Sequence, residues 1–301
     1  MDLLKNESNV KTAINFLSPE VLKEKLADLI EIIPVLNSLS GHSIVIHVPF
    51  ETVFKDNLLK GFVKELHFLK QFEIDVVLIP QIIPDDDNYV KDIFKDQVHL
   101  NKIPSTDLYD MLETRLSSKL IKALNVSGCS SLAISGNESM SVVGSIKTKL
   151  LLNEETGVHE MKLDSKYAKI DFFNTDVIND ILQTDIMPVI LPSASNSSGN
   201  KKYFVNSVEL ASVISHKLTA EKLIIGLHED GIHDADGNLI TAIGSRDTLK
   251  FNNENLTYAA EAVINDVKSA HLINLTKEYS LIIEVFTKQG SGTMVYNNSS
   301  S

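Results

Sequence analysis

Short runs of aliphatic and β-branched residues alternate with helical patterns along most of the chain. Continuous apolar runs are typical of strands in a sheet that is covered on both faces. They predict five buried strands, at Ser43–Val48, Asp75–Ile79, Ser131–Ile134, Met187–Leu191 and Lys222–Leu227. The intervening residues carry apolar positions at helical spacing. This alternation predicts an α/β fold with a central, mainly parallel sheet sandwiched between helices, in three layers.

Helix starts are marked by residues that cap a first turn. Ser18 followed by Pro19 predicts the beginning of one helix, because a serine side chain accepts from the first free amides and proline suits the first helical position. Ser105 predicts the start of a second helix, and Asn206 or Ser207 the start of a third.

Two segments break the strand–helix alternation. Gly144–Leu152 and Val158–Leu163 predict a β-hairpin that stands off the main sheet, and Asp234–Asn238 predicts a tight turn between two short strands. Ser193–Asn200 is rich in serine and asparagine, which is typical of a surface loop.

Composition and charge exclude several classes of protein. The 301 residues are 43% apolar and carry a formal net charge of −12, so we expect no nucleic-acid partner and no binding to an anionic membrane. The single cysteine, Cys129, cannot form a disulfide within the chain and suits a reducing compartment. No basic, apolar leader precedes residue 18, and no apolar run reaches the ~18 residues of a membrane span. These features predict a cytoplasmic protein.

The densest polar cluster follows the predicted strand Lys222–Leu227, where open α/β sheets hold their ligands. It runs from His228 to Asp234, and His228, Glu229 and His233 could bind a metal ion or a nucleotide. The alternative is a solvated loop that leads into the hairpin. Asp234–Asn238 also resembles the start of a calcium loop, but Ser245 stands where the bidentate glutamate would be needed.

No glycine-rich phosphate motif is present in the sequence. Gly290–Thr293 comes nearest, but no helix follows it to direct a dipole at a phosphate. The acidic run Asp85–Asp87 could hold a divalent cation or could simply be solvated. The residues by themselves therefore indicate a layered α/β protein with an anionic small ligand as one option.

A set of collinear segments carries a more specific resemblance. In order and spacing they resemble N-acetylglutamate kinase, of the amino-acid kinase family, over residues 18–296; they are Asn174–Asn179, Ile186–Pro192, Ala220–Ile224, Asp234–Ile240, Glu284–Thr287 and Gly290–Val295. The resemblance implies an acyl-amino-acid (acetylglutamate-like) domain at 18–215, a nucleotide domain at 216–301 and an N-terminal extension or helix at 1–17. It also implies transfer of phosphate from Mg-ATP to a carboxylate.

The chain departs from the family at the positions that would perform this transfer. His47 and Tyr258 stand where the resemblance places catalytic lysines, and Val208 where it places the aspartate that orients them. His47–Phe50 and Ile79–Ile82 replace the glycine turns that would approach the phosphates. The chain is thus expected to be a divergent member that lacks the usual catalytic residues. Phosphoryl transfer depends on such cations and amides, so their loss argues against transfer by the mechanism of the family.

Other positions retain family-like residues. The resemblance implies that Asn206, Asn101 and Lys102 bind substrate and that His228 and Gly231 bind nucleotide. His271, Glu284 and Gly290 correspond to the arginine-binding positions of arginine-inhibited members, and a carboxylate such as Glu284 is the natural partner of a guanidinium. The alternative is that Glu284 and the glycines serve only the local strand and turn.

Two main hypotheses follow for function. The first is a catalytically impaired regulatory or arginine-sensing subunit of arginine metabolism, which would form a homo-oligomer or a hetero-oligomer with a related enzyme and bind arginine or an acetylglutamate-like acid. The second is an active kinase with a rebuilt site that uses Lys102 or Lys147 as its cation and needs Mg-ATP. A metal-binding module at His228 and His233 is a third option, although no metal or other cofactor is indicated with certainty.

Overall fold

The structure is a computed structural model that describes residues 30, 32–82, 105–139, 141–146, 148–152, 159–163, 167–287 and 290–298. The chain divides into two compact units, residues 1–40 and 41–301. In the first unit residues 32–39 are helical, and Leu36 and Leu39 are buried. The predicted helix start at Ser18 and Pro19 lies outside the described residues. The elements below all belong to the second unit.

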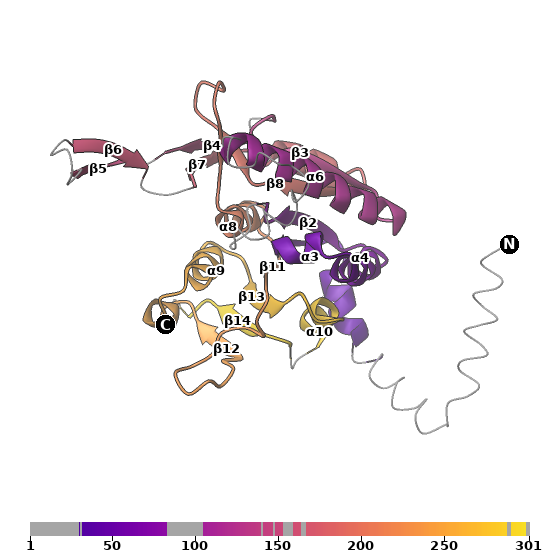
Figure 1. The fold of residues 1–301 in the computed structure, drawn as a ribbon. Coiled ribbons are helices and arrows are strands. Elements are labelled where there is room, and N and C mark those ends of the chain that lie inside the picture. Colours follow the sequence, from indigo (N-terminus) through magenta and orange to yellow (C-terminus); the bar gives the residue numbers. More distant parts are fainter. Residues whose placement is uncertain are drawn as a thin grey trace. The chain divides into compact units, whose positions relative to one another are not determined.

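An eight-stranded sheet forms the centre of the second unit, in the order β12-β14-β13-β11-β1-β2-β8-β3 (Figure 1). Among these strands only β13 and β14 pair antiparallel. The five predicted strands and the mainly parallel sheet are confirmed. The strands are β1 (Ser43–Val48), β2 (Asp75–Pro80), β3 (Ser131–Ser135), β8 (Met187–Leu191), β11 (Lys222–Leu227), β12 (Ala242–Gly244), β13 (Ser269–Asn274) and β14 (Thr293–Tyr296).

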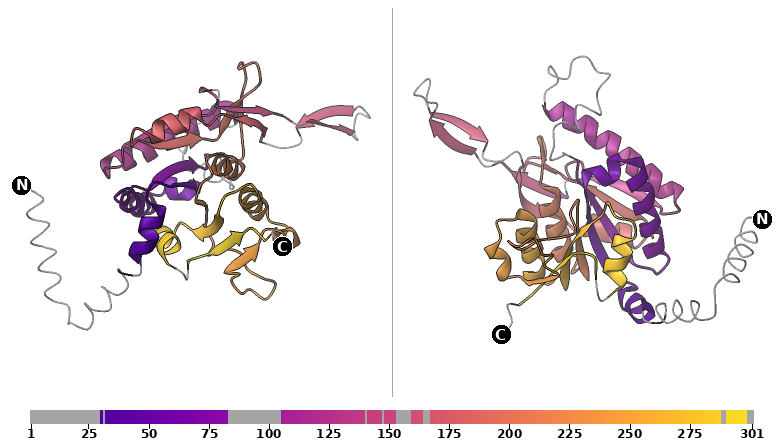
Figure 2. Two further views of the ribbon diagram at one scale, coloured as in Figure 1. Left: turned by 180° about the vertical axis from the view of Figure 1, so that it is seen from behind. Right: turned by 60° about the horizontal axis from the view of Figure 1, so that its bottom comes forward.

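Helices cover both faces of the sheet, as the alternation predicts (Figures 1 and 2). One face carries α8 (Ser207–Lys217) and α9 (Glu254–Ile264), which pack against each other. The other carries α3 (Phe50–Phe54), α4 (Asp56–Lys70), α6 (Ser105–Val126) and α10 (Ser280–Phe286). The helix α7 (Asp176–Leu182) contacts β8, and a 3₁₀ turn η2 (Asp247–Lys250) follows β12. The helix starts predicted at Ser105 and at Asn206 or Ser207 are confirmed.

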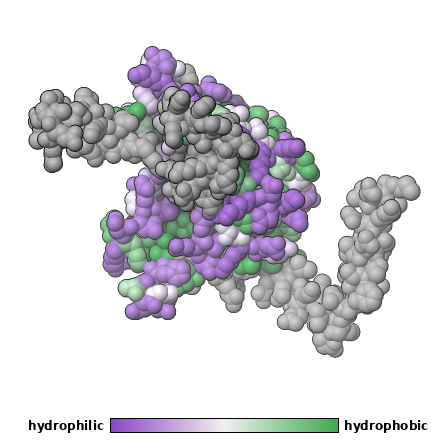
Figure 3. Space-filling model, viewed as in Figure 1, coloured by the Kyte–Doolittle hydropathy of each residue, from purple (hydrophilic) through white to green (hydrophobic). Residues whose placement is uncertain are grey.

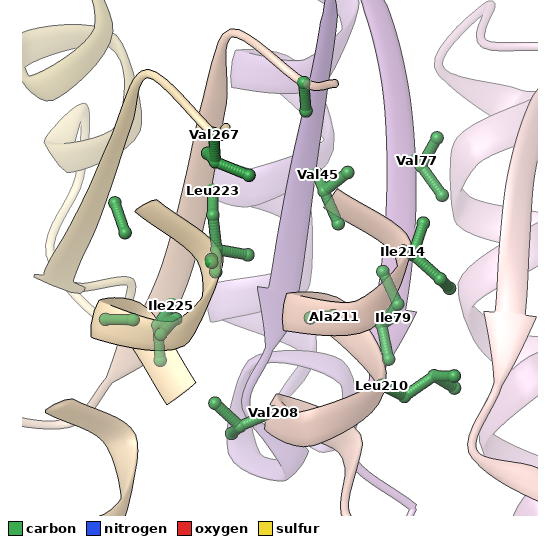
Figure 4. Close-up of a cluster of buried hydrophobic side chains, with 14 of the residues drawn as sticks. Val45, Val77, Ile79, Val208, Leu210, Ala211, Ile214, Leu223, Ile225 and Val267 are labelled. Carbon is green, nitrogen blue, oxygen red and sulfur yellow. The ribbon is translucent and has the colours of Figure 1, made fainter. Parts of the chain in front are cut away.

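The core lies between the sheet and α8 (Figure 4). Val45, Val77 and Ile225 from the strands face Ala211 and Ile214 from α8, and all five are buried. Each valine, leucine or isoleucine that is removed from water in this way contributes about 1.5–3 kcal/mol. This packing fixes the position of α8, whose first turn reaches the carboxyl edge of the sheet.

Two smaller sheets lie outside the central one. β10 (Lys202–Phe204), β9 (Ser193–Ser195), β4 (Val142–Ser145) and β7 (Lys169–Phe173) form one in that order, and β5 (Thr148–Leu152) with β6 (His159–Leu163) forms the other. The antiparallel β5–β6 pair confirms the predicted hairpin, although Gly144 belongs to β4.

The prediction of a surface loop at Ser193–Asn200 is wrong for the first three residues. Ser193–Ser195 form the buried strand β9 rather than a surface loop. Serine tolerates this burial because its hydroxyl finds a partner: Ser193 Oγ lies 2.9 Å from Ser135 Oγ.

The visible surface is mostly polar. Hydrophilic residues predominate on the face shown in Figure 3, and hydrophobic ones appear there in separate patches. Within the described ranges, none of the helices combines the length and apolar character needed to cross a membrane.

Candidate functional site

A cleft of about 580 Å³ opens at the carboxyl edge of the central sheet. The ends of β1, β2 and β11 border it, and α8 and α9 begin beside it, which is where open α/β folds bind ligands. Six of the predicted site residues meet there: His47, Asn206, Val208, His228, Glu229 and Gly231. The other residues that line it are Pro49, Gln81, Tyr167, Ser207, Gly226, Leu227, Ile232, Asn252, Asn253, Glu254 and Asn255.

His47 lines the cleft and connects two elements of the fold. Its Nε2 is 3.1 Å from Ser207 Oγ, so the end of β1 is joined to the first turn of α8. The imidazole is buried. A side chain held in this way has its position fixed by the scaffold.

Val208 and Tyr258 both pack against the hydrophobic core. Val208 belongs to the buried cluster, and the ring of Tyr258 packs against that cluster from α9. Burial raises the pKa of Tyr258, and the nearby carboxylates of Glu209 and Glu254 raise it further. Tyr258 therefore remains a neutral phenol; its hydroxyl donates to Glu254 Oε1 at 3.1 Å, and it does not line the cleft.

Asparagine side chains cap both helices that begin at the cleft. Asn206 Oδ1 accepts from Val208 N at 2.8 Å and from Glu209 N at 3.2 Å. Asn253 Oδ1 accepts from Leu256 N at 3.0 Å. These caps satisfy amides that would otherwise be free to bind an anion, and they give Asn206 a structural role whether or not it contacts a substrate.

The loops that follow β1 and β2 are joined to each other. Gln81 N donates to Val48 O at 2.8 Å, and Phe50 N donates to Gln81 Oε1 at 3.2 Å. Pro49 has no amide hydrogen to offer. At this point of the cleft the backbone donors are therefore engaged within the protein.

The described residues that line the cleft contribute carboxylates and neutral polar groups. Among the described residues that line it there is no lysine or arginine, whereas Glu229 and Glu254 contribute carboxylates. Burial raises the pKa of the nearby Glu209, and the negative charges of Glu261 and Glu254 add to that effect. A polyphosphate would meet little positive charge on these residues.

The loop from His228 to Asp234 is held by contacts of its own. Asn274 Nδ2 donates to His228 O at 2.9 Å and to Asp230 Oδ1 at 3.0 Å. Asp234 Oδ1 accepts from Asp236 N and Asn238 N, which forms the predicted tight turn. The strands beside this turn are reduced to a single bridge between His233 and Leu239.

Three of the predicted site residues form a second, separate cluster. His271 Nδ1 lies 2.6 Å from Glu284 Oε1, and both side chains are only 4% exposed. The other carboxylate oxygen of Glu284 accepts from the amide and the hydroxyl of Ser291. Gly290 has a φ of +64°, and a Cβ there would lie 2.9 Å from Glu284 Oε2. The carboxylate is thus enclosed by a histidine, a serine and a turn whose backbone conformation favours glycine.

The protonation states in this cluster follow from its contacts. Burial lowers the pKa of His271, so the imidazole is neutral at neutral pH. Its Nδ1–H donates to Glu284, and Nε2 is left to accept from Lys222 Nζ at 3.3 Å or from Ser269 Oγ at 2.8 Å. Burial would raise the pKa of Glu284, but the donors from His271 and Ser291 outweigh it, and the pKa lies below its usual value.

Two residues of the Glu284 cluster were not indicated by the sequence patterns. Lys222 and Ser291 complete the Glu284 cluster, and no motif singles them out because their roles come from strand pairing and a turn. Asn101, Lys102 and Lys147 lie outside the described residues, as does the acidic run Asp85–Asp87. In the part of the chain that is described, no group of three or more His, Cys, Asp or Glu side chains is placed to hold a metal ion.

Three layers and a mainly parallel sheet with a cleft at its carboxyl edge define a three-layer α/β protein; folds of this kind hold their ligands at that edge. The sequence profile of the amino acid kinase family matches residues 87–266, and the chain belongs to that family. Curated relatives include acetylglutamate kinases from Hydrogenobaculum sp. (28% identical, over 92% of this chain and 99% of the relative) and Kosmotoga olearia (27% identical, over 91% and 98%).

Solved structures are similar in fold. N-acetylglutamate synthase from Neisseria gonorrhoeae, in complex with coenzyme A and N-acetylglutamate, superposes with a TM-score of 0.72 at 19% identity; the match covers 91% of this chain and 64% of the synthase. An isopentenyl phosphate kinase gives a TM-score of 0.58 at 14% identity, over 84% of this chain and all of that one. The amino-acid kinase fold and the resemblance to acetylglutamate kinase that the sequence predicts are confirmed.

Proposed function

We propose that this chain is an acetylglutamate-kinase-like protein that transfers phosphate poorly or not at all and acts as an arginine-binding regulatory subunit. The observation that carries the first half is the composition of the cleft: no lysine or arginine is among its described lining residues. Phosphoryl transfer spreads negative charge over the migrating group, and cations must offset that charge. Removing one such stabilising group commonly costs ~10²–10³ in rate.

The chemistry around His47 supports the same proposal. A buried imidazole that is held at 3.1 Å from Ser207 Oγ is a poor substitute for a mobile ammonium group. Val208 offers no carboxylate to orient a cation, and Tyr258 offers no positive charge. The amides of Gln81 and Phe50 already donate within the protein, so a phosphate oxygen would have to displace those bonds.

The arginine half of the proposal rests on the Glu284 cluster. A guanidinium presents several donors in a plane and pairs well with a carboxylate. An arginine side chain would replace the His271 and Ser291 donors at Glu284, and the turn at Gly290 keeps side-chain atoms away from the carboxylate. One N. gonorrhoeae synthase structure of the same fold contains L-arginine with coenzyme A. By analogy, a regulatory role implies assembly with copies of this chain or with a related active enzyme.

The alternative is an active kinase with a rebuilt site. It is favoured by the acetylglutamate kinases that align with over nine-tenths of this chain. Lys102 and Lys147 are the cations it would use. This alternative requires measurable binding of Mg-ATP, whereas the regulatory proposal requires binding of arginine.

A thermal-shift panel separates the two. Purified full-length chain is heated with L-arginine, with Mg-ATP or with N-acetylglutamate, each at millimolar concentration, and D-arginine serves as the control for non-specific effects of a cation. A ligand at about 100 times its Kd adds ~2.7 kcal/mol to the free energy of unfolding. We expect a rise of several degrees in Tm with L-arginine and no rise with Mg-ATP.

Other outcomes have definite meanings. A rise with Mg-ATP would favour the rebuilt kinase. A rise with both arginine enantiomers, or with neither, would contradict a specific arginine site.

A further inference from the structure

A second hollow lies far from the cleft, between α4 and α6. These helices lie side by side on the same face of the sheet (Figures 1 and 2). The groove between them encloses about 760 Å³. Its apolar lining is formed by Leu59 and Val63 from α4 and by Ala123 and Val126 from α6. None of the functional residues considered above takes part in it.

Lysines stand on both sides of this apolar groove. Lys60 and Lys64 lie one turn apart on α4, and Lys119 and Lys122 face them from α6. Lys119 is engaged at one end, where its Nζ lies 2.7 Å from Asp56 Oδ1.

The three other lysines are exposed, and none of them forms an ion pair with a described residue. The groove therefore carries a positive charge, although the chain as a whole has a net charge of −12.

The groove also leaves apolar surface in contact with water. Val126 is 81% exposed at the end of α6. Removing this side chain from water against a partner would add to the free energy of binding.

We propose that this groove docks an acidic amphipathic helix of a partner protein. The furrow between two packed helices accepts the ridge of a third, because side chains at helical spacing fit between those of the pair. Its length, from Leu59 to His67 along α4, suits a few helical turns. An apolar stripe on the partner would contact the exposed Val126 and the half-buried Ala123, above the buried Leu59 and Val63. Acidic residues on both sides of that stripe would meet the lysines.

The placement of the charges favours an acidic occupant over a basic one. Lys60 and Lys64 recur at four residues on α4, and Lys119 and Lys122 at three on α6, so both rows follow helical spacing. A basic partner would be repelled at the groove. An acidic partner would be repelled by most of the remaining surface, which directs it to this one site.

The test uses a synthetic peptide of about 15 residues, long enough to hold helical structure, with leucines on one face and glutamates on both sides of them. Its binding to the full chain is followed by fluorescence anisotropy at low and at high salt. A second peptide carries lysines in place of the glutamates. The protein variants are the triple substitution Lys60→Glu, Lys64→Glu, Lys122→Glu and, as a matched control, Lys217→Glu at the exposed end of α8.

We expect the glutamate peptide to bind the wild-type chain and the Lys217→Glu control alike, with weaker binding at high salt. The triple variant should lose at least about tenfold in affinity and should gain affinity for the lysine peptide. Circular dichroism and Tm show whether the variant is folded. A gain of affinity for the lysine peptide in a variant shown to be folded, relative to the Lys217→Glu control, locates the contact at the groove.

Three results would overturn the proposal. The first is no binding of the glutamate peptide to the wild-type chain. The second is equal binding to the wild-type chain and to the folded triple variant. The third is a homodimer, measured by light scattering, that the triple substitution dissociates, because a second copy of this chain would then cover the groove.

Discussion

Nε2 of His47 lies 3.1 Å from Oγ of Ser207, although the two residues are 160 positions apart in the chain. The contact joins the carboxyl end of β1 to the first turn of α8, directly beside the cleft. In the resemblance to acetylglutamate kinase, this strand end would carry a lysine that reaches the phosphates. Here the side chain of His47 connects β1 to α8.

This role predicts measurable coupling between the two side chains. In a double-mutant cycle with His47→Ala and Ser207→Ala, unfolding in denaturant should give a coupling free energy of about 0.5–1.5 kcal/mol, the usual net value of a hydrogen bond. Ser212→Ala, in the second turn of the same helix, paired with His47→Ala serves as the control and should show no coupling. Additive effects in the His47–Ser207 cycle would mean that the contact contributes nothing.

Glu284 should matter for both stability and arginine. Glu284→Gln keeps the volume but removes the charge that accepts from His271 and Ser291, so we expect a loss of about 1–3 kcal/mol in the free energy of unfolding. The arginine-dependent rise in Tm should disappear as well. Glu138→Gln, at an exposed position, is the control. Unchanged stability together with an intact arginine response would refute the assignment.

The same carboxylate has a defined pH dependence. Because its pKa is held below the ordinary 4.5, the ionised form is favoured in the folded state. Its stabilisation is present above pH ~4.5 and is lost as the pH falls through the folded-state value. The free-energy difference between the wild type and Glu284→Gln should therefore shrink as the solution is acidified.

Gly290 offers a test of the turn that encloses this carboxylate. Gly290→Ala adds a Cβ that would lie 2.9 Å from Glu284 Oε2, in addition to the strain of a φ of +64°. Gly237→Ala is a matched control, because φ is +84° there and no heavy atom lies within 4 Å of the added Cβ. We expect each substitution to cost about 1 kcal/mol for the backbone, with a larger total at Gly290. Equal costs would show that the turn does not constrain Glu284.

A buried carboxyl group at Glu65 predicts the opposite pH trend. Glu65, on α4, accepts from Tyr279 N at 3.2 Å and Ile282 N at 3.1 Å at the start of α10. Burial raises its pKa from 4.5 to about 7, more than these amide donors lower it. Between these two values the folded state holds a proton that the unfolded state has released. Its contribution to stability is therefore complete below pH ~4.5 and declines as the pH rises to about 7.

Glu65→Gln should remove this dependence. The free energy of unfolding of the wild type, relative to that of the variant, should fall on the order of 3 kcal/mol between pH 4.5 and 7. Denaturant titrations at several pH values measure it, and Glu138→Gln should follow the wild type. A constant difference between wild type and Glu65→Gln across this window would contradict the raised pKa.

The fold was largely predictable because its strands are buried on both faces. The runs at Ser43–Val48, Met187–Leu191 and Lys222–Leu227 match their strands residue for residue, since a parallel strand covered on both faces forms a nearly continuous apolar run in the sequence. Ser193–Ser195 was predicted wrongly because serines are typical of loops. Its burial depends on contacts between distant segments, such as those of Ser193 with Ser135 and of Ser195 with Val142.

The candidate sites were predictable only in part. The position of His228 after a strand and the spacing of His271, Glu284 and Gly290 are readable in the sequence. The pairing of Gln81 with the loop after β1, and the approach of Lys222 to His271, depend on which strands are neighbours. Such contacts come from the strand order of the sheet, which no local pattern specifies.

The most direct measurement of the central claim is N-acetylglutamate-dependent release of ADP from Mg-ATP by the purified full-length chain. The acetylglutamate kinase from Hydrogenobaculum sp. serves as the positive control under identical conditions. The absence of cations among the described cleft residues predicts a rate that is indistinguishable from the reaction without protein. Substrate-dependent release that His47→Ala abolishes would contradict it and would establish this chain as a working kinase.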